Sequence, residues 1–245
     1  MKQQQTKQPI KTVKQDTIEN LLETLNMTCS RNQIKKEEEN IIKEFLQKEV
    51  VYRSEHKVRK LLSSCGLKKH QLRTFENFDW KFNLKLPRED IFSFKNSDWI
   101  NSPRNLVMIG DAGVGKTHWA RSLVYDAIIK GETAYFITAF DLINKIKNAV
   151  RPDAKVNRFG NHYKVLVIDE LGYTAQTKES GDVIFQIIAK RAETLPTIIT
   201  TNLAPKQWGS LFAGTAATAI LDRLSYNGSF LMMEGPSYRG RPIKK

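Results

Sequence analysis

Residues 105–131 constrain the fold of this chain more than any other stretch. A short apolar run at 106–109 is followed by a glycine-rich turn and then by a helical pattern. The turn at 110–117 reads GDAGVGKT and matches the phosphate-loop pattern G-x-x-x-x-G-K-S/T at every fixed position. Apolar residues at i, i+3, i+4, i+7 and i+8 from Ala120 predict a helix with one buried face. The segment therefore has the order strand, loop, helix that the pattern requires.

Each fixed residue type in this loop suits a triphosphate. Glycine adopts backbone angles that other residues avoid, so the three loop glycines let main-chain N–H groups turn toward a phosphate. Lys116 suits the β and γ phosphates, and the Thr117 hydroxyl suits Mg²⁺, which prefers oxygen ligands. We therefore expect ATP and Mg²⁺ as ligands. The expected nucleotide contacts in the loop are Gly110, Asp111, Ala112, Gly113, Val114, Gly115, Lys116, Thr117 and His118.

A second apolar run ends in two carboxylates. Residues 164–168 read KVLVI and precede Asp169 and Glu170, which is typical of a central parallel strand buried on both faces. We expect this strand to lie beside the strand that precedes the phosphate loop. Asp169 would then hold Mg²⁺ through water, and Glu170 would act as general base on the attacking water. The simpler alternative is that the two acids only cap the next helix.

A polar residue follows a third run. Residues 197–201 read TIITT and predict another strand, with Asn202 at its tip. A side chain at this point can orient water between Glu170 and the γ-phosphate. Thr200 and Thr201 are the alternative groups for this task.

Large apolar residues, most of them aromatic, precede the phosphate loop. Leu72, Phe75, Phe78 and Trp80 either cover an adenine or fill a domain junction, and packing is the simpler interpretation.

The charge balance favours a polyanion as partner. The 245 residues carry a formal net charge of +13, and the excess is spread along the chain. Nucleic acid is the simplest polyanion, although some basic proteins are merely soluble. One basic cluster is either a set of phosphate contacts or a polar surface loop. Its members are Lys145, Lys147, Arg151, Lys155 and Arg158.

The composition argues against a membrane or secreted protein. No apolar run approaches the roughly 18 residues that span a bilayer. The first residues, MKQQQTKQPIKTVKQ, lack the apolar core of a secretory signal. We expect a cytoplasmic protein with no membrane partner.

Composition and periodicity divide the chain into three parts. Residues 1–15 are rich in Gln and Lys and predict a disordered basic lead-in. Residues 16–70 predict a small helical module, whose longer helical stretch runs from 33 to about 64. Residues 71–245 hold the motifs above and predict the ATPase domain.

Five motifs in a fixed order resemble one family. GDAGVGKTHWA, VLVIDELGY, TIITTN, ILDRL and GPSYR are similar to those of the IstB family of transposition helper ATPases, close relatives of the DnaC-type helicase loaders in the AAA+ superfamily. The resemblance covers roughly residues 17–240. It implies an α/β fold, namely a three-layer AAA+ P-loop ATPase with a central, mainly parallel sheet, preceded by the small helical module.

The resemblance also implies roles for single residues. Asn202 matches the sensor-1 position, and Arg223 matches the arginine finger that reaches the γ-phosphate of a neighbouring subunit. Arg239 would be a second arginine near the nucleotide. The simpler alternatives are a surface salt bridge between Asp222 and Arg223 and a basic tail contact for Arg239. The basic cluster falls where initiator-type relatives carry a helical insertion that faces DNA. Asp111 departs from the family, which often has a neutral residue there, and its charge could weaken nucleotide affinity.

The implied function is to help a transposase. Copies of the chain would assemble through ATP-bridged interfaces on duplex DNA, activate or target the transposase, and hydrolyse ATP. One alternative is a replicative helicase loader that acts on single strands. Another is a nucleotide-switched DNA scaffold in which turnover is incidental.

Overall fold

The chain divides into two compact units, Met1–Lys60 and Leu61–Lys245. The computed structural model describes residues 17–172, 178–210, 212 and 216–240. The basic lead-in expected over residues 1–15 lies outside these residues.

In the first unit, α1 (Ile18–Thr24) packs through one small core against the N-terminal part of α2 (Glu39–Ser64). Thr17 caps α1, because its hydroxyl accepts a hydrogen bond from the Asn20 N–H at 3.4 Å. The apolar stripe of α1 then meets the N-terminal half of α2. The buried core residues are Ile18, Leu21, Leu22, Leu25, Ile34 and Leu46.

Helix α2 begins later than the periodicity predicted. The expected helix started at Gln33, but that residue ends a 3₁₀ turn, η2 (Arg31–Gln33). The Ser30 N–H donates to Gln33 Oε1 at 2.9 Å, and Ile34 is extended with a ψ of 122°. This local capping box competes with the helix, so α2 starts only at Glu39.

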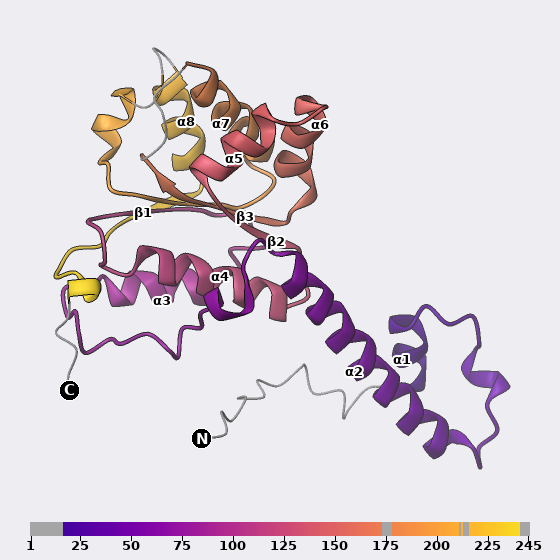
Figure 1. The fold of residues 1–245 in the computed structure, drawn as a ribbon. Helices are drawn as coiled ribbons and strands as arrows, with labels where there is room; N and C mark the ends of the chain where they lie inside the picture. Colours follow the sequence, from indigo (N-terminus) through magenta and orange to yellow (C-terminus); the bar gives the residue numbers. More distant parts are fainter. Residues whose placement is uncertain (1–16, 173–177, 211, 213–215, 241–245) are drawn as a thin grey trace. The chain divides into compact units, whose positions relative to one another are not determined.

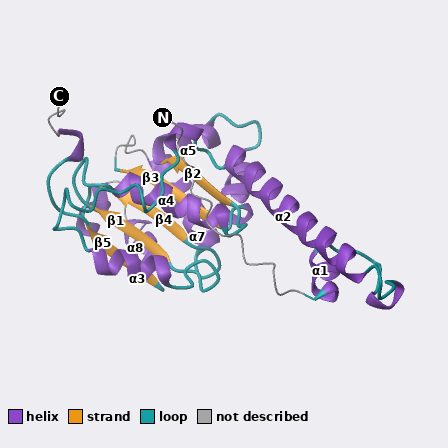
Figure 2. Cartoon of the chain, turned by 90° about the horizontal axis from the view of Figure 1, so that it is seen from below, coloured by secondary structure: helices purple, strands orange, loops and turns teal. Residues whose placement is uncertain are grey.

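The second unit is a three-layer α/β structure built on a five-stranded parallel sheet (Figure 1, Figure 2). The strand order is β2-β3-β4-β1-β5, and every pairing is parallel. The predicted α/β fold with a central parallel sheet is therefore confirmed. The strands are β1 (Asn105–Ile109), β2 (Ala134–Thr138), β3 (Val165–Leu171), β4 (Thr197–Thr201) and β5 (Gly228–Met232).

Helices cover both faces of the sheet (Figure 1). One layer holds α3 (Arg88–Asn96) and α4 (Lys116–Ile129). The other holds α5 (Ala139–Lys147), α6 (Pro152–Asn157), α7 (Lys178–Arg191) and α8 (Ala216–Ser225). Among the helices of the described residues, none combines the length and the apolar character needed to cross a bilayer. Short helical turns are η3 (Lys69–Gln71), η4 (Arg158–His162), η5 (Pro205–Ser210) and η6 (Tyr238–Gly240).

Strand β3 does not lie beside β1, so that prediction was wrong. β4 separates them, because Ile199 pairs with Val107 of β1 on one side and with Ile168 of β3 on the other. All three strands are apolar and buried. A continuous apolar run reports burial on both faces, but it does not report which buried strand is the neighbour.

A buried arginine anchors the segment that precedes β3. Arg191 ends α7, is 0% exposed, and donates to the carbonyl oxygens of Phe159 at 3.1 Å, Tyr163 at 2.9 Å and Pro196 at 2.8 Å. Burial lowers its pKa to about 9, so it stays protonated at neutral pH. No carboxylate of the described residues lies within ion-pair distance. Its further acceptors are Gly160, Lys164 and Thr197.

We expect Arg191→Met to lower the free energy of unfolding by about 3 kcal/mol. Each buried carbonyl that loses its hydrogen-bond donor destabilises the folded state by about 1–3 kcal/mol. Removing the buried charge offsets part of this loss, because its desolvation cost disappears. Urea unfolding measures the loss, with Arg151→Met at an exposed position as the matched control. Equal stability of the two variants would contradict an anchoring role.

Candidate active site

The phosphate loop joins β1 to α4 in a conformation that only glycine tolerates. Gly113 and Gly115 have φ of +87° and +111°. A Cβ at Gly113 would lie 2.0 Å from Ser237 Oγ, and one at Gly115 would lie 2.8 Å from the Phe78 ring. Segments of the same chain around Phe78 and Ser237 therefore pack directly against the loop.

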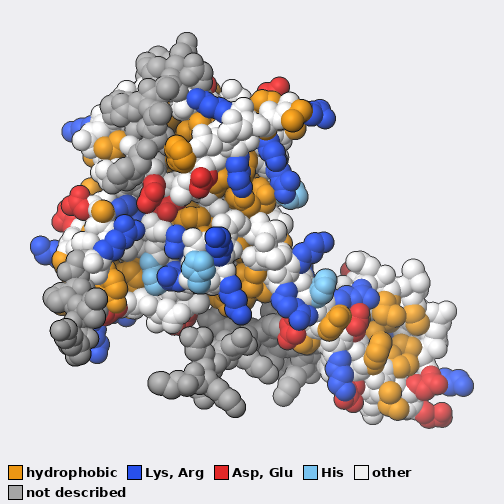
Figure 3. Space-filling model, in the orientation of Figure 1, with side chains coloured by type: hydrophobic (Ala, Val, Ile, Leu, Met, Phe, Trp, Pro, Cys, Tyr) orange, Lys and Arg blue, Asp and Glu red, His pale blue; other side chains and the backbone are white. Residues whose placement is uncertain are grey.

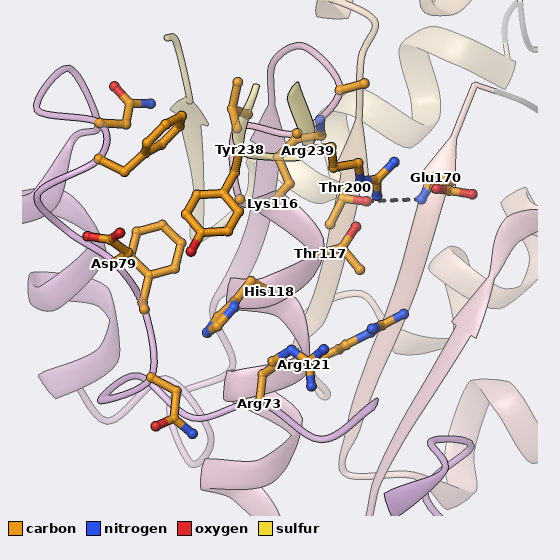
Figure 4. A pocket seen from close by; sticks show the side chains of 18 of the residues that line it. Arg73, Asp79, Lys116, Thr117, His118, Arg121, Glu170, Thr200, Tyr238 and Arg239 are labelled. Atoms are coloured by element: carbon orange, nitrogen blue, oxygen red, sulfur yellow. Dashed lines mark hydrogen bonds between the residues drawn. The ribbon is translucent and has the colours of Figure 1, made fainter. Parts of the chain in front are cut away.

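A pocket of about 800 Å³ opens over this loop (Figure 4). Glu170, Asn202 and Arg239 line it together with most of the loop. Gly110 and Asp111 are not among its lining residues. The loop residues that line it are Ala112, Gly113, Val114, Gly115, Lys116, Thr117 and His118.

Lys116 lies half-buried at the floor of the pocket. Its Nζ donates to the carbonyl oxygens of Gly110 at 2.7 Å and Asp111 at 2.8 Å. Burial lowers the pKa of Lys116, and the carboxylates of Asp169 and Asp111 partly offset this shift. A phosphate in the pocket would favour the charged form further, since opposite charge stabilises it.

Asp169 is almost completely buried, and two hydroxyl groups hold it. Its Oδ1 accepts from Thr117 Oγ1 at 3.1 Å and also from Thr200 Oγ1. The residue is 2% exposed. Strand β3 thus delivers this carboxylate to the first turn of α4, although β4 lies between β3 and β1.

Glu170 is exposed and lines the pocket, whereas Asp169 is buried behind the Thr117 and Thr200 hydroxyls. The Glu170 N–H donates to Thr200 Oγ1 at 2.9 Å (Figure 4). Its φ of +60° is strained for a residue with a side chain, and the register of β3 against β4 shifts between Ile168 and Leu171. The two consecutive carboxylates lie in different surroundings, one buried and one exposed, and the strained backbone lies at the site itself.

The Thr117–Asp169 pair fits Mg²⁺. Both groups supply oxygen, and Asp169 has no Lys or Arg within ion-pair distance in the described residues. Mg²⁺ usually takes one or two protein ligands and completes its shell with phosphates and water. In the described part of the chain, no group of three or more His, Cys, Asp or Glu could hold a metal by itself.

Asn202 differs from the two threonines before it. Thr200 is engaged with Asp169 and Glu170, and Thr201 Oγ1 donates to the Leu171 carbonyl. Asn202 is exposed and lines the pocket. Its amide is therefore placed to contact a pocket ligand, whereas both hydroxyls are used within the protein.

The segment after β5 lies over the phosphate loop of the same chain. Met233 N–H donates to the Ile109 carbonyl at 2.7 Å, and Tyr238 N–H donates to the Gly113 carbonyl at 3.0 Å. These bonds bring Arg239 to the pocket from within its own chain.

Comparison with known proteins decides the family. The family model described as IstB-like ATP-binding protein matches residues 11–245. The chain belongs to that family. It is 32% identical over 199 residues to a protein named for ATP binding in insertion sequence IS5376 of Geobacillus stearothermophilus, covering 80% of this chain and 78% of the relative. A second relative, from insertion sequence IS232 of Bacillus thuringiensis subsp. berliner, is 35% identical over 167 residues and 67% of each chain.

Solved structures show the same fold. The crystal structure of DnaI is similar to this IstB-like chain with a TM-score of 0.58 over 70% of this chain and 93% of that chain. Sequence identity to it is 20%, so this likeness speaks for the fold alone. The predicted AAA+ fold and the resemblance to the IstB family are both confirmed.

Arg223 of this IstB-like chain lies outside its own pocket. Its guanidinium stands 5.1 Å from the centre of the Phe185 ring, and its Nη1 donates to the Ala219 carbonyl at 3.0 Å. The side chain is half-buried on α8 and does not line the pocket. The structure therefore does not bring Arg223 together with Lys116 and Glu170 within one chain.

The basic cluster is also separate from the pocket. Lys145 and Lys155 line a shallow groove between α5 and α6. Lys147 and Arg151 are exposed, and Arg158 contacts the ring of Tyr163.

Sequence reasoning missed several residues of the pocket. Phe82 and Tyr238 meet edge to face at 4.9 Å and line it with Leu72 and Phe78. The packing interpretation holds for the other two aromatics, because Phe75 and Trp80 contact Trp119 at 4.8 Å and 4.9 Å. Sequence spacing does not tell the aromatic residues that line the pocket from those that pack on Trp119.

Two arginines at one end of the pocket were missed as well. Figure 4 shows Arg73 and Arg121 next to each other, with Tyr238 and Arg239 at the other end. Burial lowers the pKa of Arg121, and the positive charge of Arg73 acts in the same direction. Arg121 follows Thr117 by four residues, so its place on the pocket face of the helix was available from the sequence.

Proposed function

We propose that this IstB-like protein binds ATP with Mg²⁺, hydrolyses it at interfaces between copies of the chain, and helps a transposase on duplex DNA. One observation carries the proposal: the pocket gathers Lys116, Thr117 and Glu170, whereas Arg223 lies outside it. With Arg223 as the arginine finger that the resemblance implies, a complete site needs a second copy. The names of the relatives, which are ATP-binding proteins of insertion sequences, support the link to transposition.

The residues of one chain supply most of the chemistry. Main-chain N–H groups of the loop and the Lys116 ammonium hold the phosphates, and Asn202 orients the attacking water. That water forms a bond to the γ-phosphorus, the bond to the bridging oxygen breaks, and Glu170 takes the proton. The products are ADP and phosphate. Thr117 and Asp169 would hold Mg²⁺, whose charge would neutralise part of the phosphate charge.

The neighbouring copy supplies the remaining charge. Arg223 of that copy would face the γ-phosphate and stabilise the transition state, as arginine fingers do. Arg239 would contact the nucleotide from the same chain, since hydrogen bonds hold its segment on the loop. The chain would therefore form homo-oligomers through ATP-bridged interfaces.

Duplex DNA is the proposed polyanion. The net charge of +13 supports a phosphate-rich partner, and the basic cluster lies away from the nucleotide pocket. Both ligands can then bind at the same time. The DNA contacts that we propose are Lys145, Lys147, Arg151, Lys155 and Arg158.

We expect the triple variant Lys145→Ala, Lys147→Ala, Arg151→Ala to bind duplex DNA more weakly and with a flatter salt dependence. The slope of log K against log[salt] should shrink by about 0.9 for each phosphate that the protein no longer neutralises. Fluorescence anisotropy of a labelled duplex, with ATP present and over a series of salt concentrations, measures both effects.

The matched control removes three exposed lysines elsewhere, Lys81, Lys85 and Lys206. If both triple variants lose affinity equally, the DNA surface is not the basic cluster. The same assay with a single strand of equal length tests the loader alternative, because a marked preference for single strands and stimulation by a helicase would favour it.

A further inference from the structure

Two tyrosines meet at the edge of the sheet. Tyr135 lies on the edge strand β2, and Tyr163 follows η4 just before β3 begins. Their ring centroids are 4.7 Å apart with an interplanar angle of 32°. Tyr163 is buried and Tyr135 is half-buried. The two rings therefore pack against each other beneath the neighbouring surface side chains.

Each tyrosine holds one cation of the basic cluster. Lys145 Nζ donates to Tyr135 Oη at 2.9 Å and stands 5.5 Å from the ring centre. Arg158 Nε donates to Tyr163 Oη at 3.2 Å, with its guanidinium 5.8 Å from that ring centre. No carboxylate within the described ranges is in ion-pair distance of either cation. Both charges are thus fixed in place but not neutralised.

Arg191 anchors the segment that carries Tyr163 from the interior of the protein. It donates to the carbonyl oxygens of Phe159, within η4, and Tyr163, which follows η4, and this segment carries Arg158 toward the surface. Burying a guanidinium that pairs only with carbonyl groups has a large desolvation cost. Its effect here is to hold one short surface segment rigidly.

A groove continues the surface beside Lys145. Asn144, Asn148 and Lys155 line it with Lys145, and Asp141 is its one acidic lining residue. Asp141 Oδ2 accepts from the Thr138 hydroxyl at 2.9 Å, so part of its hydrogen-bonding capacity is used within the chain. Amide and ammonium donors along a groove suit consecutive phosphates. In Figure 3, Lys and Arg side chains gather near α5 and α6.

We propose that Tyr135 and Tyr163 are positioning residues that hold Lys145 and Arg158 ready for the phosphodiester backbone of duplex DNA. This inference rests on the proposed function. Long cationic side chains lose rotamer freedom on binding, and this loss opposes association. The hydrogen bond to tyrosine restricts the cationic side chain before DNA binds, so less rotamer freedom is lost on binding. Because tyrosine is neutral, the full positive charge of Lys145 or Arg158 stays available for the phosphate. The contacts carry no base readout, so binding here is independent of sequence.

The test separates position from charge. Tyr135→Phe and Tyr163→Phe keep both rings and both cations but remove the hydroxyl acceptors. We expect each to weaken binding of a labelled duplex about 2- to 12-fold, with an unchanged salt slope, because no charge is lost. Lys145→Ala instead should lower the slope by about 0.9. Tyr226→Phe, at an exposed position, is the matched control and should bind like the parent chain.

The outcomes distinguish the two proposals. If both Phe variants bind like the parent chain at every salt concentration while Lys145→Ala lowers the slope, the positioning role is wrong and the DNA surface stands. If Lys145→Ala and Arg158→Ala also keep parental affinity and slope, the DNA surface itself is wrong. Because Tyr163 is buried, urea unfolding of its variant is measured in parallel, and the half-buried Tyr135 gives an independent test.

Discussion

Arg223→Ala should keep ATP affinity and lose about 10³- to 10⁵-fold in turnover, the range by which arginine fingers accelerate phosphoryl transfer. Arg223 does not line the pocket of its own chain and stands over Phe185, so its loss leaves the local nucleotide contacts intact. Steady-state ATPase assays over a range of protein concentrations measure the turnover, and titration with a fluorescent ATP analogue measures the affinity.

Mixing two inactive variants tests whether the site is shared. Arg223→Ala offers an intact pocket, and Glu170→Gln offers an intact finger. In an equal mixture, about one quarter of the head-to-tail interfaces combine the two intact halves, so turnover should return to about a quarter of the parental rate. Arg88→Ala, an exposed arginine, serves as control. Full turnover of Arg223→Ala alone, or no recovery in the mixture, would remove the case for a composite site.

Glu170→Gln should retain ATP binding and lose about 10²- to 10⁴-fold in turnover, the usual contribution of a general base. Its carboxylate is exposed to the pocket, and its backbone is held by Thr200, so the amide should occupy the same place without taking a proton. Single-turnover hydrolysis of bound ATP isolates this step from nucleotide exchange.

Lys116→Ala provides the contrast, because it removes a phosphate contact. It should lower ATP affinity about 10- to 100-fold, as expected for one charge-assisted hydrogen bond. Comparing the two variants in a transposition assay distinguishes a helper that needs ATP hydrolysis from a DNA scaffold that needs only ATP binding. If Glu170→Gln supports full transposition while Lys116→Ala abolishes it, ATP binding suffices and turnover is incidental.

The parts that the sequence determined by itself are local. The phosphate loop occupies eight consecutive residues, and glycine, lysine and threonine at fixed spacing leave little choice of conformation between a strand and a helix. The apolar run before Asp169 likewise predicted a buried parallel strand, and β3 is such a strand. The family followed from five such short motifs, whose order was enough for recognition.

Only the tertiary structure decided which distant segments meet. It placed β4 between β1 and β3, brought Phe78 and Tyr238 to the pocket, and kept Arg223 out of it. It also set Lys145 and Arg158 on a pair of tyrosines from two separate segments. Apolar periodicity reports how deeply a residue is buried, whereas its partners depend on how the strands are ordered and how the chain returns between them. That information lies in contacts between remote residues, which no single stretch of sequence contains.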